Sequence, residues 1–227
     1  MFNLVVFDLE GTLVKHTTRQ AKIVENSITS QGIKLSIDVE YLYSLRSKPE
    51  FHSAKDFVKE LLKRNETSFD EKLIDAIVNE YKKLRQDPAY LFELQYLFSG
   101  TKETLEQLKQ NGVKLVLLTN ANPKQTNYLI ERFDLKKYFD LVLDDSCDLP
   151  EKPDPARINF ILEKFDLNPD EVLIVEDSEA GIEAGKKAKI KTCGVLTGNA
   201  TEKGLKAAKA DYILESVKEL PLEIFGE

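Results

Sequence analysis

Six short apolar segments constrain the fold of this chain more than any other feature of its sequence. They are rich in leucine and β-branched residues, and polar residues do not alternate regularly with apolar ones along them. Strands of a parallel sheet have this character, because helices cover both faces of such a sheet. The six segments are 4–9, 113–119, 139–145, 171–177, 191–197 and 211–216.

Helical patterns separate the last five of these segments. Apolar residues within 158–165 recur with the period of one helix face. Asn122 and Asp154 each precede a proline, which predicts an N-cap residue followed by proline in the first helical turn, and Ser178 is a further candidate cap. Strand and helix in alternation predict an α/β fold, with a Rossmann-like parallel sheet and helices on both faces.

The first two apolar segments are much farther apart than the others. Residues 10–112 separate them, whereas a crossover connection needs only a few tens of residues. Apolar residues with helical spacing occur within this stretch at 23–28, 54–61 and 73–84. We therefore predict an all-α cap domain over 15–88, inserted into an α/β core that is formed by 1–14 and 89–227.

Charge and composition exclude several classes of partner. The chain has 32 basic and 39 acidic residues and a formal net charge of -7, so a basic surface for nucleic acid or for an anionic membrane is not expected. No apolar run reaches the ~18 residues that a membrane-spanning helix needs. Two cysteines cannot form a disulfide framework, and no leader sequence is evident, so we expect a cytoplasmic protein. Nothing in the sequence indicates the oligomeric state.

Polar and charged side chains follow the predicted strands. Ligands of open α/β sheets bind beyond the carboxyl ends of the strands, so residues at these ends are candidates for a functional site. They are Asp8, Glu10, Thr119, Asn120, Glu176 and Asp177, and Lys152 lies in the loop after the third segment. We expect carboxylates, a hydroxyl, an amide and one lysine to meet at one edge of the sheet.

Four motifs in this order carry a resemblance to a known family. They are VVFDLEGTLV, LLTN, EKPDP and VEDSEAGIEAGKKA. The set resembles the haloacid dehalogenase superfamily, and in particular its helical-cap subgroup of phosphoglycolate phosphatases and β-phosphoglucomutases. The resemblance covers nearly the whole core, and the predicted insertion lies where this family places its smaller cap. It implies a Mg²⁺-dependent phosphatase that hydrolyses a small phosphorylated metabolite through an aspartyl-phosphate intermediate.

The resemblance also implies roles for individual residues. Asp8 is the candidate nucleophile, because attack by a carboxylate divides one difficult displacement into two easier steps. Glu10 lies on the same side of the strand and is placed to protonate the leaving group and then to activate water. Most family members have Asp at this position, although the enolase-phosphatase branch has Glu. Lys152 would neutralise developing charge. Thr119, Asn120 and Lys152 would bind the phosphoryl group.

The resemblance also implies a bound divalent cation. Glu176 and Asp177 are candidate Mg²⁺ ligands, because Mg²⁺ prefers carboxylate oxygens and shares its coordination with phosphates. By resemblance, Asp8 and the backbone carbonyl of Glu10 complete the protein ligands. Without the cation, these carboxylates would repel a phosphate.

Substrate specificity and two alternative functions remain open at this point. Arg46 and Lys48, in a loop of the predicted cap, are candidates to bind an anionic part of the substrate, and a role as solvated surface cations is the alternative. A phosphomutase of the β-phosphoglucomutase type would use the same core but retain its phosphoenzyme. A non-catalytic protein that binds a phosphoryl ligand or a protein partner is the third reading, motivated by Glu10.

Overall fold

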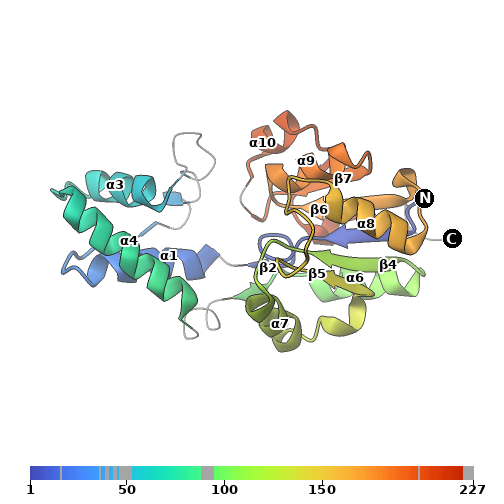
Figure 1. The fold of residues 1–227 in the computed structure, drawn as a ribbon, viewed down its shortest axis with the longest axis horizontal. Coiled ribbons are helices and arrows are strands. Elements are labelled where there is room, and N and C mark those ends of the chain that lie inside the picture. The colour runs from blue at the N-terminus through green and yellow to red at the C-terminus, as the bar shows by residue number, and fades with distance from the viewer. Residues whose placement is uncertain are drawn as a thin grey trace. The chain divides into compact units, whose positions relative to one another are not determined.

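The chain forms two compact units in the computed structural model (Figure 1). The structure describes residues 1–15, 17–35, 37–38, 41–42, 45, 53–87, 95–198 and 200–221. The core unit comprises Met1–Lys15 and Tyr96–Glu227, and the helical unit comprises His16–Gln95.

The core unit is built on a six-stranded sheet in which all neighbouring strands are parallel. The strands are β1 (Leu4–Phe7), β4 (Lys114–Leu118), β5 (Leu141–Leu143), β6 (Val172–Glu176), β7 (Lys191–Val195) and β8 (Tyr212–Leu214). Their order across the sheet is β5-β4-β1-β6-β7-β8, so β4 and β6 flank β1. Each predicted apolar segment contains one of these strands, and the predicted α/β class with a Rossmann-like parallel sheet is confirmed.

Helices cover both faces of this sheet (Figure 1). They are α6 (Thr101–Gln110), α7 (Pro123–Arg132), α8 (Ala156–Phe165), α9 (Glu179–Lys187) and α10 (Glu202–Ala207), with 3₁₀ turns at Lys136–Tyr138, Pro169–Glu171 and Val217–Glu219. Val5 and Phe7 of β1 pack in one buried cluster with residues of α6 and α7. Leu4 and Val6 point to the opposite face and pack with residues of α8 and α9. Burial on both faces explains why these strands are apolar throughout.

Two of the three predicted N-caps are confirmed. The side chain of Asn122 accepts a hydrogen bond from the backbone N–H of Gln125, and that of Ser178 accepts one from Gly181. The prediction for Asp154 is wrong, because α8 begins at Ala156 and the residue before it occupies the cap position. Asp154 instead accepts a hydrogen bond from the N–H of Ala156, two residues on, in an Asx turn.

A short antiparallel pair of strands lies where the chain leaves and re-enters the core unit. β2 (Val14–Lys15) pairs with β3 (Tyr96–Leu97), with Val14 opposite Leu97 and Lys15 opposite Tyr96. The backbone N–H of Phe98 also donates to the carbonyl of Leu13 at 3.1 Å. This pair was not predicted, because two-residue strands are too short to show a period.

The helical unit contains α1 (Thr17–Thr29), α3 (Ala54–Arg64) and α4 (Glu71–Gln86). All three stretches of helical spacing seen in the sequence lie on these helices. Ser53 and Asp56 form a capping box at the start of α3, and Asp70 caps α4. The apolar faces meet in one cluster that includes Val24, Ile28, Val58, Leu61, Ile74 and Ile77.

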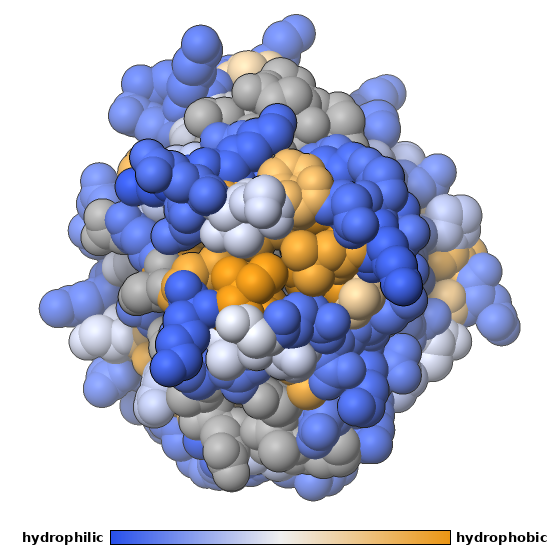
Figure 2. All heavy atoms as spheres, turned by 90° about the vertical axis from the view of Figure 1, so that its left-hand side faces the viewer, coloured by the Kyte–Doolittle hydropathy of each residue, from blue (hydrophilic) through white to orange (hydrophobic). Residues whose placement is uncertain are grey.

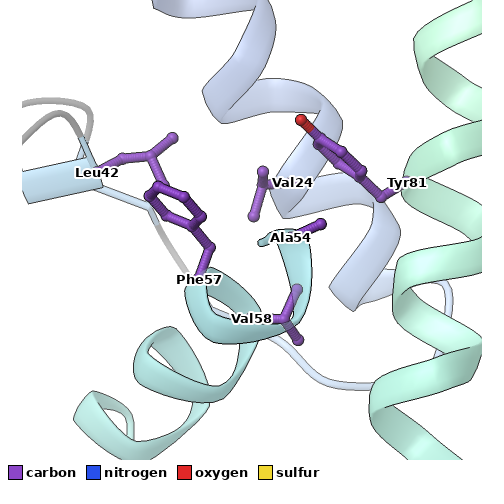
Figure 3. A pocket seen from close by; sticks show the side chains of 6 residues that line it. All are labelled: Val24, Leu42, Ala54, Phe57, Val58 and Tyr81. Atoms are coloured by element: carbon purple, nitrogen blue, oxygen red, sulfur yellow. The ribbon is translucent and has the colours of Figure 1, made fainter. Parts of the chain in front are cut away.

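Apolar side chains also reach the surface in the view of Figure 2. Within the helical unit, six residues line a small pocket (Figure 3). Val24 belongs to α1, Tyr81 to α4, and Ala54, Phe57 and Val58 to α3, while Leu42 lies between α1 and α3 in the chain. Its volume of about 20 Å³ is close to what a single water molecule requires. Among the described helices, none has the length and apolar character required to span a bilayer.

Candidate active site

The sheet topology brings three strand ends together at one edge. Phe7, the last residue of β1, is in register with Leu117 of β4 on one side and with Val175 of β6 on the other. The N–H of Asp8 donates to the carbonyl of Val175 at 3.1 Å, which fixes the chain as it leaves β1. The side chains that follow β1, β4 and β6 therefore lie near the middle of the sheet edge, where ligands of α/β folds bind.

Three acidic side chains form a buried cluster at this edge. Asp8, Glu176 and Asp177 are 7%, 0% and 2% exposed, and one carboxylate oxygen of each lies within 4.8 Å of those of the other two. Buried carboxylates need compensating positive charge or hydrogen bonds. Three hard oxygen donors at this separation suit a small divalent cation such as Mg²⁺.

Lys152 supplies positive charge to this cluster. Its ammonium group donates to Asp8 Oδ1 at 2.7 Å, to Glu176 Oε1, and to the backbone carbonyl of Leu118 at 3.0 Å. These three acceptors satisfy the three donors of an ammonium group. The Lys152 side chain is 5% exposed, so the ion pairs are shielded from solvent. The loop before α8 thus places one cation between β1 and β6.

Burial and charge perturb the ionisation of all three groups. Burial raises the pKa of Glu176 to about 7, and the neighbouring ammonium of Lys152 opposes this rise. Burial likewise raises the pKa of Asp8, against the attraction of Lys152. Burial alone would lower the pKa of Lys152, but Asp8 and Glu176 more than offset it and hold that pKa above its ordinary value. A buried cation and buried carboxylates that depend on one another are typical of functional sites.

The family model for haloacid dehalogenase-like hydrolases matches residues 5–195 of this chain. The chain belongs to this family. The matched range includes all the strand ends described above, from Asp8 to Asp177, and the resemblance found in the sequence is confirmed.

Proteins of similar length that resemble this hydrolase are named as phosphatases or as a phosphomutase. The phosphoglycolate phosphatase of Aquifex aeolicus is 27% identical over 195 residues, which are 86% of this chain and 85% of that protein. The crystal structure of a predicted phosphatase from Clostridium acetobutylicum is 25% identical, covers 99% of this chain and 98% of its own, and has a TM-score of 0.69. A structure assigned as β-phosphoglucomutase from Thermotoga maritima is 25% identical, with 98% coverage of both chains and a TM-score of 0.70.

Thr119 and Asn120 of the hydrolase lie where β4 ends. The hydroxyl oxygen of Thr119 accepts a hydrogen bond from the N–H of Ala121 at 3.1 Å, and the side chain is 3% exposed. The Asn120 amide donates to the carbonyl of Lys152 at 3.2 Å and accepts from its N–H at 3.3 Å. Both ends of this amide are therefore bound to the backbone of Lys152, which ties the end of β4 to the loop that carries the buried cation.

Glu10 lies two residues beyond Asp8 in the tight turn that follows β1. It is partly exposed, in contrast to the three buried acids. The turn closes through a hydrogen bond from the N–H of Gly11 to the carbonyl of Val14 at 2.8 Å. Gly11 has φ +98°, a left-handed conformation that favours glycine.

Two contributions to the site were not predicted from the sequence. Arg157 is 2% exposed, and its guanidinium donates to the carbonyls of Leu149, Thr119 and Cys147 at 3.0, 3.3 and 3.4 Å. It therefore joins the end of β4 to the loop that precedes Lys152. Ser178 was predicted only as a helix cap, but its hydroxyl also donates to Glu176 Oε2 at 3.0 Å. The predicted cap at Ser178 could have indicated its hydrogen bond to Glu176, because the two residues are two positions apart at the same strand end. No local pattern distinguishes Arg157 from a surface arginine.

Arg46 and Lys48, the candidate specificity residues, lie outside the described residues. Their role stays a prediction.

Proposed function

We propose that this hydrolase is a Mg²⁺-dependent phosphatase that acts on a small phosphorylated metabolite through an aspartyl-phosphate. The observation that carries the proposal is the buried cluster of Asp8, Glu176 and Asp177 with Lys152 between two of its members. A cluster of carboxylates that already contains one cation can accept a second cation, and the two together can receive the negative charge of a phosphoryl group. The names of the relatives are consistent with this reaction class.

In the first step, an oxygen of Asp8 attacks phosphorus while the bond from phosphorus to the ester oxygen breaks. Lys152, at 2.7 Å from Oδ1, orients the Asp8 carboxylate and neutralises charge as it moves onto the phosphoryl oxygens. Glu10 gives its proton to the departing oxygen, so the leaving group is a neutral alcohol. The partly exposed position of Glu10 allows it to meet both a substrate and solvent.

In the second step, Glu10 takes a proton from a water molecule, which attacks the phosphorus of the aspartyl-phosphate. The bond from Asp8 to phosphorus breaks, inorganic phosphate leaves, and both carboxyl groups return to their starting states. One additional methylene in Glu10, relative to the Asp of most family members, gives the acid more reach without removing its chemistry.

Mg²⁺ would be held by the side chains of Asp8, Glu176 and Asp177 and by the backbone carbonyl of Glu10. The three side chains fit this role because they are hard oxygen donors within 4.8 Å of one another. When bound, the ion supplies positive charge that offsets the charge of the phosphoryl group. The Thr119 hydroxyl would donate a hydrogen bond to a phosphoryl oxygen, since its oxygen already accepts from the N–H of Ala121. Asn120 contributes through the position of Lys152.

The helical unit is proposed to act as a cap that contributes to substrate choice and excludes water. Arg46 and Lys48 are retained as the candidate residues for an anionic part of the substrate.

The reaction is tested by phosphate release from p-nitrophenyl phosphate with Mg²⁺, with EDTA and with Mg²⁺ restored. We expect EDTA to abolish activity and Mg²⁺ to restore it, and Asp8→Asn to be inactive. Asp144→Asn is the matched control, because Asp144 also follows a strand of the sheet but accepts hydrogen bonds from the N–H and hydroxyl of Ser146 in its local turn. Activity that survives Asp8→Asn, or the absence of activity under every condition, would contradict the proposal.

A phosphomutase is the second candidate, since a structure assigned as a β-phosphoglucomutase covers nearly the whole chain. A mutase would convert one sugar phosphate into its isomer without net release of phosphate. Phosphorus NMR of a reaction with hexose phosphates separates the two: free phosphate supports the phosphatase, and an isomeric sugar phosphate supports the mutase.

A further inference from the structure

Asp177 lies between two glycines that come from different parts of the chain. Gly11 belongs to the turn after β1, and Gly198 belongs to the loop after β7. A Cβ atom at Gly11 would lie 2.2 Å from Asp177 Oδ2, and one at Gly198 would lie 1.9 Å from the same oxygen. These separations are far below a van der Waals contact, so the carboxylate fills the space that a side chain at either position would need.

Hydrogen bonds tie these two backbone segments together. The hydroxyl of Thr197 donates to the carbonyl of Gly11 at 2.6 Å. The N–H of Ala200 donates to the backbone carbonyl of Asp177 at 2.8 Å. The loop after β7 is therefore anchored both to the turn after β1 and to Asp177 itself. We call the arrangement of Gly11, Thr197 and Gly198 around this side chain the glycine slot.

We propose that Gly198 is a positioning residue for the divalent cation, because with Gly11 it holds the Asp177 carboxylate in the orientation required for cation binding. The inference rests on the proposed function, since it assumes that Asp177 is a cation ligand. Mutation of a group that orients a metal ligand typically lowers metal affinity or activity by about 10- to 100-fold. At both glycines the carboxylate meets backbone, which has no side-chain rotamers, so these two contacts are well suited to fix its orientation.

A substitution at Gly198 tests the glycine slot more directly than one at Gly11. Gly11 has φ +98°, so any side chain there would strain the backbone even without a steric clash, whereas Gly198 lies outside that region. A Cβ atom at Gly198 would also lie 2.4 Å from the Cβ atom of Asp177. Rotation of the carboxylate cannot relieve that contact, because the position of Asp177 Cβ is fixed by its backbone. Gly198→Ala must therefore displace Asp177 or the loop.

The decisive measurement is isothermal titration calorimetry of the full-length protein with Mg²⁺ in the absence of substrate. For Gly198→Ala we expect the affinity for Mg²⁺ to fall by about 10- to 100-fold, the range typical of groups that orient metal ligands. Gly185→Ala is the matched control: its Cβ would lie 2.6 Å from Thr192 Cγ2 and 2.7 Å from Ile174 Cγ2, in the core rather than at the cluster. We expect this control to lower the urea midpoint while the folded protein keeps its Mg²⁺ affinity.

Thr197 provides a second, milder test that does not insert an atom into the slot. Thr197→Val removes the hydrogen bond to Gly11 and is expected to weaken Mg²⁺ binding, whereas Thr197→Ser keeps the hydroxyl and is expected to restore it. If Gly198→Ala fails to fold, this pair of variants decides the question.

The outcomes separate the two proposals. If the wild-type protein binds Mg²⁺ and Gly198→Ala binds it equally well, the proposal for Gly198 is wrong. The same holds if Thr197→Val and Thr197→Ser bind Mg²⁺ with equal affinity. Neither result contradicts the proposed phosphatase function. A wild-type protein that neither binds Mg²⁺ nor releases phosphate overturns the proposed function, and the inference falls with it.

Discussion

Replacement of Lys152 by methionine tests how the buried cluster is held. Methionine keeps the length and much of the volume of the side chain but removes its charge. Lys152 contacts Asp8 and Glu176, and the side chains of these three residues are 5%, 10% and 1% exposed, respectively. Removal of one partner from a buried ion pair costs about 3–5 kcal/mol, because it leaves an uncompensated charge. We expect Lys152→Met to lower the free energy of unfolding by that amount in EDTA.

The loss of unfolding free energy caused by Lys152→Met should become smaller as the pH falls. Without Lys152, the pKa values of Asp8 and Glu176 rise further, so the folded variant binds protons that its unfolded chain does not bind. Each such proton adds about 1.4 kcal/mol of stability for every unit by which the pH falls, until the pH nears the pKa of the unfolded carboxyl. The difference from wild type should therefore be largest at about pH 8 and shrink toward about pH 5.

The assay is urea denaturation in EDTA across this pH range, and the matched control is Lys109→Met. Lys109 pairs with Asp140, but the two side chains are 35% and 27% exposed, so the pair is expected to contribute only about 0–1 kcal/mol. A loss for Lys152→Met no larger than that for Lys109→Met, or a loss that does not change with pH, would refute the reasoning. With Mg²⁺ present, the folded fraction of Lys152→Met is also expected to lose about 10²–10³ in kcat.

Three further predictions follow from other groups. Because burial raises the pKa of Glu176 to about 7, wild-type stability in EDTA should fall as pH rises through 7, and Glu176→Gln should flatten this dependence in urea titrations. Burial alone would raise the pKa of Asp211, but hydrogen bonds from Lys186 and Thr192 hold that pKa below its ordinary value. The ionised carboxylate therefore stabilises the fold above about pH 4, and this stabilisation is lost as the pH falls. Asp211→Asn should therefore lose about 1–2 kcal/mol at pH 7, and its melting temperature should decline less in acid. Arg157→Met should cost about 1–3 kcal/mol in urea denaturation, because it leaves three backbone carbonyls without a donor, and Arg157→Lys should recover part of this loss.

The strands of the core could be predicted because their signal is local. A strand that is buried on both faces must be apolar at every position, and that property is visible in 4–9 or 171–177 without knowledge of the neighbours. The order of the strands depends on pairings between distant segments, and the sequence does not contain it in readable form. The rule that ligands bind at strand ends nevertheless identified Asp8, Glu176 and Asp177, because it requires only the end of each strand and not its place in the sheet.

The features that were missed depend on partners far along the chain. Arg157 follows a helix start and would ordinarily be exposed, but its three acceptors come from two loops that only the fold brings to it. Gly198 is one glycine in an ordinary turn until Asp177 is placed beside it. The cap prediction at Asp154 failed for a smaller reason: the proline after it took the cap position, so the helix began one residue later.

The short pair of β2 and β3 brings the two ends of the inserted segment together. Lys15 and Tyr96 face one another across two antiparallel strands, so the core chain could be closed there by a two-residue hairpin turn such as Asn-Gly. The ends of the inserted segment are thus already the ends of a hairpin loop. Exchange of the segment between them would leave in place the strand ends that are followed by Asp8 and Asp177 and the loop that carries Lys152.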